Sequence, residues 1–200
     1  MPASFPSSEH IADSLVFRAA LRQERLAARM ALDEKTRAAL SVRIEIHLAA
    51  LLTPLPPRTL SFCAPVRGEF DARPLACLLI ECGWQAAMPV ADATNAPMSF
   101  RTWTPSSAMD CGRYGIPVPA EGQAVVPDIV LLPLVAFDPH GFRLGYGGGY
   151  FDRTLAVLVP RPLTIGVGFE LARVADIRPQ AHDLPLDAVV TEAGIVRRNT

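Results

Sequence analysis

The run IVLLPLVAFDPHGFRLGYGGGYFDR occupies residues 129–153. Its first seven residues, 129–135, are apolar throughout, which is typical of a strand covered on both faces. Pro133 is expected at the end of that strand or at a bulge. A glycine-rich loop follows, and then a helix is predicted from about Tyr150 to Val159. Because ligands of open α/β sheets bind beyond the carboxyl ends of the strands, this loop lies where a site is expected.

The segments on either side predict the rest of an α/β fold. A strand at 59–64, a helix at 71–82 and a strand at 84–90 form a unit typical of parallel pairing. Further strands are predicted at 98–103, 163–169 and 187–191, and an irregular loop region at 104–127. Two helices come first, at 9–30 and at 33–52, the second with Asp33 as its N-cap. We expect one three-layer α/β domain over residues 1–200, preceded by these two helices, with a flexible tail at 1–8.

Composition excludes several classes of protein. The chain has 200 residues, of which 50% are hydrophobic, and its net charge is −1. This balance excludes intrinsic disorder and provides no basic field for binding nucleic acid. The longest apolar stretch, 125–137, is too short and too interrupted to span a bilayer. The four cysteines include no CxxC pair, so neither a zinc site nor a disulfide framework is expected, and we predict a cytoplasmic protein.

The loop before the last predicted helix has the features of an anion cradle. It holds five glycines within nine residues, at positions 141, 145, 147, 148 and 149. Glycine allows positive φ and close approach, and free N–H groups at a helix start bind anions. A P-loop is excluded because the only lysine is Lys35. A dinucleotide-binding GxGxxG pattern is excluded because Tyr150 takes the place of its third glycine. Arg143 could hold a phosphate and Asp152 a Mg²⁺ ion beside it; the alternative is a flexible turn with Asp152 as a helix cap.

The first predicted helix carries a stripe of arginines. They are spaced by four, three and four residues, which places them on one face of the helix: Arg18, Arg22, Arg25 and Arg29. Such a stripe could neutralise a polyphosphate. The alternative is a solvated face, or ion pairs with the acids Glu9, Glu24 and Glu34.

Two acidic elements follow predicted strands. Glu69, in VRGEFD after the first strand, faces the same ligand edge as the glycine loop. It could bind the donor edge of an amide or amino-pterin, or it could be a solvated loop acid. The neighbouring pair His182 and Asp183 is interpreted as structural.

The run that opens this section resembles the signature of the 5-formyltetrahydrofolate cyclo-ligase family, also called 5,10-methenyltetrahydrofolate synthetases. The family pattern is P-x-x-a-F-D-x-x-G-x-R-L-G-x-G-x-G-Y-Y-D. The matching residues are Pro133, Phe137, Asp138, Gly141, Arg143, Leu144, Gly145, Gly147, Gly149, Tyr150 and Asp152. The resemblance extends over residues 15–197, with a GE-x-D element at 68–71 and an HD-x-x-x-D-x-V-V-T-E element at 182–192.

The resemblance implies a Rossmann-like α/β sandwich with a largely parallel or mixed central sheet. It implies ATP- and Mg²⁺-dependent conversion of 5-formyltetrahydrofolate to 5,10-methenyltetrahydrofolate, with release of ADP and phosphate. The substrate is then a small molecule, with or without a polyglutamate tail; we expect a monomer with neither a nucleic-acid nor a membrane partner. Two alternatives remain: a family member that binds folate or nucleotide without turnover, and a sugar-phosphate or acyl-CoA enzyme on a similar scaffold.

The resemblance also implies roles for single residues. For ATP, it implies phosphate contacts from Arg18 and Arg22 and a loop made of Arg143, Gly145, Tyr146, Gly147, Gly148, Gly149, Tyr150 and Phe151. Arg143 and Tyr150 are the expected catalytic residues. Glu69 and Tyr114 are the expected folate contacts, and Asp152 and Asp187 the expected metal ligands. Three positions depart from the family pattern: Arg18 replaces a usual Lys, Phe151 a common Tyr, and Val118 an acid that often precedes Pro119.

Overall fold

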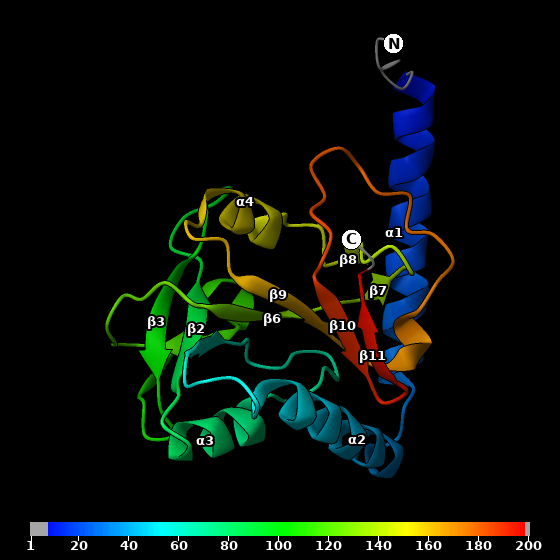
Figure 1. Cartoon of the computed structure of the whole chain (residues 1–200). Helices are drawn as coiled ribbons and strands as arrows, with labels where there is room; N and C mark the ends of the chain where they lie inside the picture. Colours follow the sequence, from blue (N-terminus) through cyan, green and yellow to red (C-terminus); the bar gives the residue numbers. More distant parts are fainter. Residues whose placement is uncertain (1–7, 199–200) are drawn as a thin grey trace.

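A computed structural model describes residues 8–198, with side chains from residue 13 onward, and is built around one large sheet (Figure 1). The order of the seven strands is β11-β10-β9-β6-β1-β2-β3. Their bounds are β1 (Thr59–Ser61), β2 (Gln85–Val90), β3 (Ser99–Trp103), β6 (Ile129–Pro133), β9 (Leu163–Val167), β10 (Ala188–Thr191) and β11 (Gly194–Arg197). The inner strands pair in parallel and the two edge strands pair antiparallel. The predicted α/β class and largely parallel sheet are therefore confirmed.

Helices cover both faces of the sheet. Helices α2 (Glu34–Leu52) and α3 (Arg73–Glu81) lie on one face, and α4 (Tyr150–Val157) lies on the other (Figure 1). Helix α1 (Ser8–Met30) stands beside the edge toward which β9 and β10 point (Figure 1). The arrangement matches the predicted three layers with two preceding helices, and it brings α1 against the edge where a ligand site was expected.

Strand β6 contributes to the two larger apolar cores, one on each face of the sheet. Ile129 and Leu131 pack with α2 and α3, whereas Val130 and Leu132 pack on the α4 side, and all four are at most 2% exposed. Alternate residues of a strand point to opposite faces, so a continuous apolar run is what two covered faces require. Pro133 is the last residue of the strand, as predicted.

The start of α2 also follows from the sequence. Oδ1 of Asp33 accepts a hydrogen bond of 2.9 Å from the backbone N–H of Thr36, which confirms the predicted N-cap. The face that α2 turns to the sheet buries Ile44, Leu48 and Leu52 completely. This burial orients α2 against β10 and β11 and completes one of the two cores.

Several short elements differ from the predictions. The segment 104–127, predicted to be irregular, contains an antiparallel pair, β4 (Met109–Cys111) and β5 (Pro117–Pro119), around the turn η1 (Arg113–Gly115). A second small pair, β7 (Ala136–Phe137) and β8 (Arg143–Leu144), precedes the glycine loop. These strands have two or three residues each, too few to produce a recognisable alternation.

The ends of the chain complete the comparison with the predictions. Residues 1–7 of the predicted tail lie outside the described residues, and Ser8 already belongs to α1. Within residues 8–198, no helix combines the length and the apolarity needed to cross a membrane.

Candidate functional site

The arginine stripe of α1 faces the carboxyl edge of the sheet. Arg22 Nε donates to the carbonyl of Gly145 at 2.8 Å, Arg25 to that of Leu171 at 3.0 Å, and Arg29 to that of Leu134 at 3.1 Å. Arg18 and Arg29 are buried, so the alternative of a solvated face is wrong. Each guanidinium is held against a loop that follows a strand, which fixes α1 against this edge.

Arg18 is engaged by an acid rather than left free. Its two terminal nitrogens reach the two carboxylate oxygens of Asp183 at 2.5 and 3.2 Å, and one of them also reaches the carbonyl of Arg178 at 3.2 Å. Burial by itself would raise the pKa of Asp183, but the hydrogen bonds from Arg18 and Gln180 and the charge of Arg18 hold it below its ordinary value. The guanidinium of Arg18, which is predicted to contact phosphate, therefore already has a buried carboxylate partner.

Arg22 lies against the glycine loop in a different way. Its guanidinium carbon is 3.5 Å from the point where a Cβ on Gly147 would stand. Within the described part of the chain, only its Nε has a hydrogen-bond partner, the carbonyl of Gly145. Burial, and next the charge of Arg18, lower the pKa of Arg22 from its ordinary value. A positive group with unused donors therefore sits beside the loop.

The glycine loop needs glycine for both conformation and space. Gly147 and Gly149 have φ values of +96° and +63°. A Cβ on Gly149 would lie 2.7 Å from Arg153 Nη1, and one on Gly148 would lie 3.0 Å from the ring of Tyr150. Gly149 is also the N-cap of α4, and no side chain caps that helix. The first amides of α4 are therefore available to an anion.

Arg143 and Asp152 form a pair beneath the loop. Arg143 Nη2 donates to Asp152 Oδ1 at 3.0 Å, and Arg143 Nη1 donates to the carbonyl of Leu184 at 3.2 Å. The Arg143 side chain is 5% exposed and that of Asp152 is 20% exposed. The structure thus brings these two predicted site residues together. Asp152 stays partly exposed beside the loop, whereas Arg143 is buried.

The two predicted metal ligands have separate partners. Asp187 accepts hydrogen bonds from the backbone and hydroxyl of Thr164 at 2.8 and 2.7 Å, and Arg161 lies 3.4 Å away. Among the side chains of residues 13–198, no three His, Cys, Asp or Glu gather into a metal-binding group. Mg²⁺ held between substrate phosphates and one or two carboxylates needs no such group. Asp152, at the first turn of α4, fits that kind of binding.

Glu69 is a buried acid and not a solvated one. Its side chain is 6% exposed, and Oε1 accepts from the hydroxyl of Tyr146 at 2.7 Å while Oε2 accepts from the amide of Val66 at 3.0 Å. Arg29 Nη2 is 3.7 Å from the carboxylate. Burial raises the pKa of Glu69 above its ordinary value, against the lowering effects of these hydrogen bonds and of Arg29 and Arg67.

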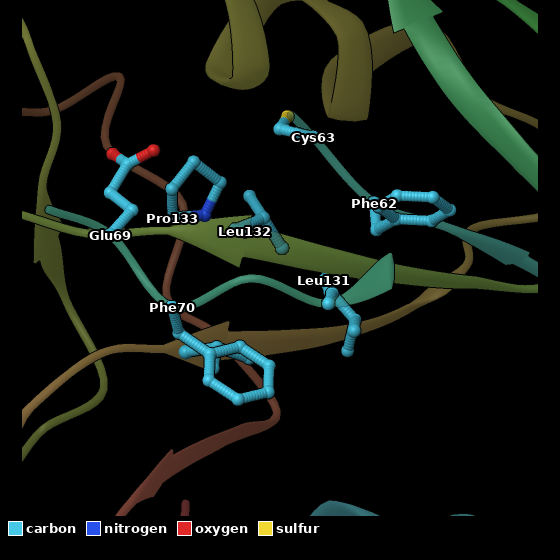
Figure 2. A pocket seen from close by; sticks show the side chains of 9 residues that line it. Phe62, Cys63, Glu69, Phe70, Leu131, Leu132 and Pro133 are labelled. Carbon is cyan, nitrogen blue, oxygen red and sulfur yellow. The ribbon is translucent and has the colours of Figure 1, made fainter. Parts of the chain in front are cut away.

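Glu69 forms the polar end of an apolar pocket. Figure 2 shows the pocket between the chain that follows β1 and the end of β6. Its lining residues are Phe62, Cys63, Glu69, Phe70, Ala72, Leu131, Leu132, Pro133 and Val167. Burial, and next the charge of Glu69, raise the pKa of the Cys63 thiol, so Cys63 is neutral there. The lining is thus apolar with one buried carboxylate, and the cavity of about 20 Å³ has room for a water molecule.

Tyr114 lies over the start of α4. Its side chain comes from η1, and the residue is 73% exposed. Its ring meets that of Tyr150 edge to face, with centroids 6.2 Å apart and hydroxyls 3.4 Å apart. The structure thus brings a predicted folate contact next to a predicted catalytic residue, with an exposed aromatic face.

Sequence reasoning missed the contact between the glycine loop and Glu69. Tyr146, assigned to ATP binding, turns its hydroxyl to Glu69 and accepts from Arg29 Nη2 at 2.6 Å. Arg67, given no role, lies 5.6 Å from the centroid of the Tyr146 ring. The only signal for this in the sequence was Arg29, the fourth member of the stripe.

Comparison with known proteins places this site in a family. The model of the 5-formyltetrahydrofolate cyclo-ligase family matches residues 16–192. The chain belongs to that family. The predictions of the family and of the ligase class of enzyme are therefore confirmed.

Individual relatives agree with this assignment. A 5-formyltetrahydrofolate cyclo-ligase of Escherichia coli strain K12 is 33% identical over 135 residues, which cover 64% of this chain and 74% of the relative. The NMR structure of the 5,10-methenyltetrahydrofolate synthetase of Aquifex aeolicus is 29% identical, with a TM-score of 0.80 over 92% of this chain and 94% of that one. The synthetase structure from Mycoplasma pneumoniae is 26% identical, with a TM-score of 0.73 over 88% and 98%.

Proposed function

We propose that the protein converts 5-formyltetrahydrofolate to 5,10-methenyltetrahydrofolate, using ATP and Mg²⁺ and releasing ADP and phosphate. One observation carries this proposal: two different sites lie next to each other at one edge of the sheet. An anion cradle, made of the glycine loop, Arg22 and the start of α4, adjoins an apolar pocket that ends in Glu69. Family membership supports the same reaction.

The cradle suits the triphosphate. Free amides at the start of α4 and the unused donors of Arg22 provide positive charge at the loop, with Gly147 to Gly149 allowing close approach. Arg18 forms a neutral pair with Asp183 and so adds no net charge to the cradle. When Mg²⁺ is bound, it neutralises phosphate charge, and Asp152 is the carboxylate placed to hold it, with Asp187 as the second proposed ligand.

The reaction needs positioning more than a nucleophilic side chain. The formyl oxygen attacks the γ-phosphorus, the bond to ADP breaks, and an iminium phosphate forms. N10 then attacks the one-carbon unit, loses its proton, and phosphate leaves as the ring closes. Arg143 and Tyr150, which flank the loop, are the proposed residues that orient and stabilise the transferred phosphoryl group.

The pocket suits the pterin. An ionised Glu69 would accept hydrogen bonds from a donor edge. The cavity is only about 20 Å³, so the apolar lining would have to part for a ring to enter between its side chains. The exposed ring of Tyr114 offers a stacking surface further along the ligand.

The test is a spectroscopic assay. Purified protein is mixed with 5-formyltetrahydrofolate, ATP and Mg²⁺, and the near-ultraviolet absorbance of the methenyl product is followed. A rise that requires both ATP and Mg²⁺ supports the proposal. Loss of this rise in Arg143→Ala and in Gly148→Glu supports the proposed site, and retained activity in both variants contradicts it.

One observation favours a second candidate, a family member that binds without turnover. Arg18 stands where the family usually has Lys, and its guanidinium is taken up by Asp183. Binding of ATP or folate measured by calorimetry, without any absorbance rise, would support this candidate instead.

A further inference from the structure

Glu69 is held by a directed chain of hydrogen bonds. Arg29 Nη2 donates to the Tyr146 hydroxyl at 2.6 Å, and that hydroxyl donates to Glu69 Oε1 at 2.7 Å. An arginine has only donors, so the tyrosine must accept from Arg29 and give its single hydrogen to the carboxylate. With Glu69 ionised, the residue types therefore fix the direction of the chain.

The surroundings of Glu69 leave it few other constraints. Its second oxygen accepts from the amide of Val66 at 3.0 Å, and Arg29 itself is 3.7 Å away. The other ionisable groups around it are Arg67, which lies over the Tyr146 ring, and the Cys63 thiol in the pocket wall. Only the Tyr146 hydroxyl holds Oε1 at hydrogen-bond distance among the described residues.

The same helix also holds the glycine loop. Arg22 binds the carbonyl of Gly145 at 2.8 Å, and two turns later Arg29 binds the hydroxyl of Tyr146 at 2.6 Å. Residues 145 and 146 are consecutive, so the backbone of the loop and the orientation of Glu69 are both set from α1. Position 146 is an open position in the family pattern, so this connection belongs to the side chain that this chain carries.

We propose that Tyr146 is a positioning residue that acts through Glu69, fixing the carboxylate for the donor edge of the folate, and does not serve ATP. The identity of the ligand rests on the proposed function. The hydrogen bond from Arg29 orients the Tyr146 hydroxyl so that its hydrogen points at Glu69.

The proposal predicts an unequal effect of Tyr146→Phe on the two substrates. Without the hydroxyl, Oε1 loses its only short hydrogen bond, so the carboxylate is less well oriented. We expect the KM for 5-formyltetrahydrofolate to rise about tenfold, as for the loss of a hydrogen bond to a charged group, and the KM for ATP to change less than about twofold. An equal rise for both substrates, a rise for ATP alone, or no change would overturn the proposal.

The pH profile gives a second readout. The Tyr146 hydrogen bond lowers the pKa of Glu69, so its removal lets burial raise that pKa further. Ionised Glu69 is the form that accepts from a donor edge, so the acid limb of kcat/KM for folate should move to higher pH in Tyr146→Phe. If Tyr146 had a purely structural role, the acid limb of the kcat/KM profile would not shift.

A double-mutant cycle identifies Glu69 as the route of the effect. In Glu69→Gln the acid limb should disappear, and adding Tyr146→Phe should weaken folate binding by less than about twofold more. Full additivity of the two changes would show that Tyr146 acts independently of Glu69 and would overturn the proposal.

Thr191→Val is the matched control. The Thr191 hydroxyl, on β10, also donates to a carboxylate, Glu170 Oε2, at 2.7 Å, and Thr191 is fully buried. This variant should leave both KM values and the acid limb within about twofold of the unmodified protein. A change equal to that of Tyr146→Phe would mean that losing any hydroxyl that donates to a carboxylate is enough, and would overturn the proposal.

Failure of the proposed function is separable from failure of this inference. Calorimetric folate affinity is measured for the unmodified protein and for Tyr146→Phe, alongside turnover. If the unmodified protein binds folate without turnover, the proposed reaction is wrong, and a loss of affinity of about tenfold in the variant still supports the role of Tyr146. If the unmodified protein binds no folate, both proposals are overturned.

Discussion

Asp183 and Glu69 are both buried carboxylates beside an arginine of α1, but the arginines at the two ends of the stripe bind them differently. Arg18 meets Asp183 directly with two nitrogens, and the pKa of Asp183 is held below its ordinary value. Arg29 stays 3.7 Å from Glu69 and reaches it through Tyr146, and the pKa of Glu69 is raised. At one end of the arginine stripe the ion pair is complete. At the other end the carboxylate can still accept hydrogen bonds from a ligand.

The difference lies in geometry more than in burial. Asp183 has its bonding capacity filled by Arg18 and by the amide of Gln180. Glu69 receives one hydroxyl and one amide and borders a pocket. A buried carboxylate with a direct bidentate partner stabilises the fold only if the pair stays intact, whereas one with remaining acceptor capacity can bind a donor.

Breaking the closed pair should have the largest effect. Arg18→Ala leaves Asp183 buried without its partner, and loss of one member of such a pair costs about 3–5 kcal/mol of stability. Urea unfolding followed by circular dichroism measures it. If Arg18 instead serves mainly ATP, the variant will keep its stability and the KM for ATP will rise.

Removing the charge at the other end should affect function and spare the fold. Glu69→Gln should lower kcat/KM for 5-formyltetrahydrofolate about 100-fold, equivalent to about 3 kcal/mol, because the donor edge loses its charged acceptor. Steady-state kinetics measures this loss, with urea unfolding as its control.

The stability of Glu69→Gln has a defined sign with pH. A folded-state pKa that is raised means that Glu69 favours folding below its unfolded pKa, and that this contribution is lost as pH rises through the folded value. The variant lacks this loss, so its stability relative to the unmodified protein should improve with rising pH. A decline relative to the unmodified protein would contradict the assignment of a raised pKa.

Arg22, between the two ends, should show an intermediate effect limited to ATP. Arg22→Ala should raise the KM for ATP about tenfold, or about 1.4 kcal/mol, by removing donors beside the loop. The KM for folate should stay within about twofold. Initial-rate kinetics with each substrate varied in turn decides, and a larger effect on folate would contradict the placement of the phosphates at Arg22.

The smallest expected effect is on the pH dependence of stability. The depressed pKa of Asp183 contributes stability that is present above its unfolded pKa, about 3.9, and lost as pH falls through the folded value. Asp183→Asn should therefore be less stable near neutral pH and lose about 1 kcal/mol less on acidification than the unmodified protein does. Urea unfolding at neutral and acid pH compares the two, and parallel pH profiles would contradict the pairing.

The sequence predicted the layers and the sheet edge of the site because those follow from local patterns. The apolar run 129–135 and the Asp33 cap act within a few residues and are confirmed. The partners of the buried acids could not be predicted in this way. Glu69 and Tyr146 are 77 residues apart, and Arg18 and Asp183 are 165 apart. Such contacts depend on how whole elements pack, which no local pattern encodes.

The span from Arg18 to Asp183 has a consequence for biosynthesis. Arg18 leaves the ribosome well before its partner, which is added 165 residues later. Domains acquire their contacts from the N-terminus onward during synthesis, and contacts between distant residues form only when the intervening chain exists. The arginines further along the stripe can therefore dock first, Arg29 on the carbonyl of Leu134 and Arg22 on that of Gly145. The Arg18–Asp183 pair forms after them, so the docking of α1 is complete only once residue 183 has been added.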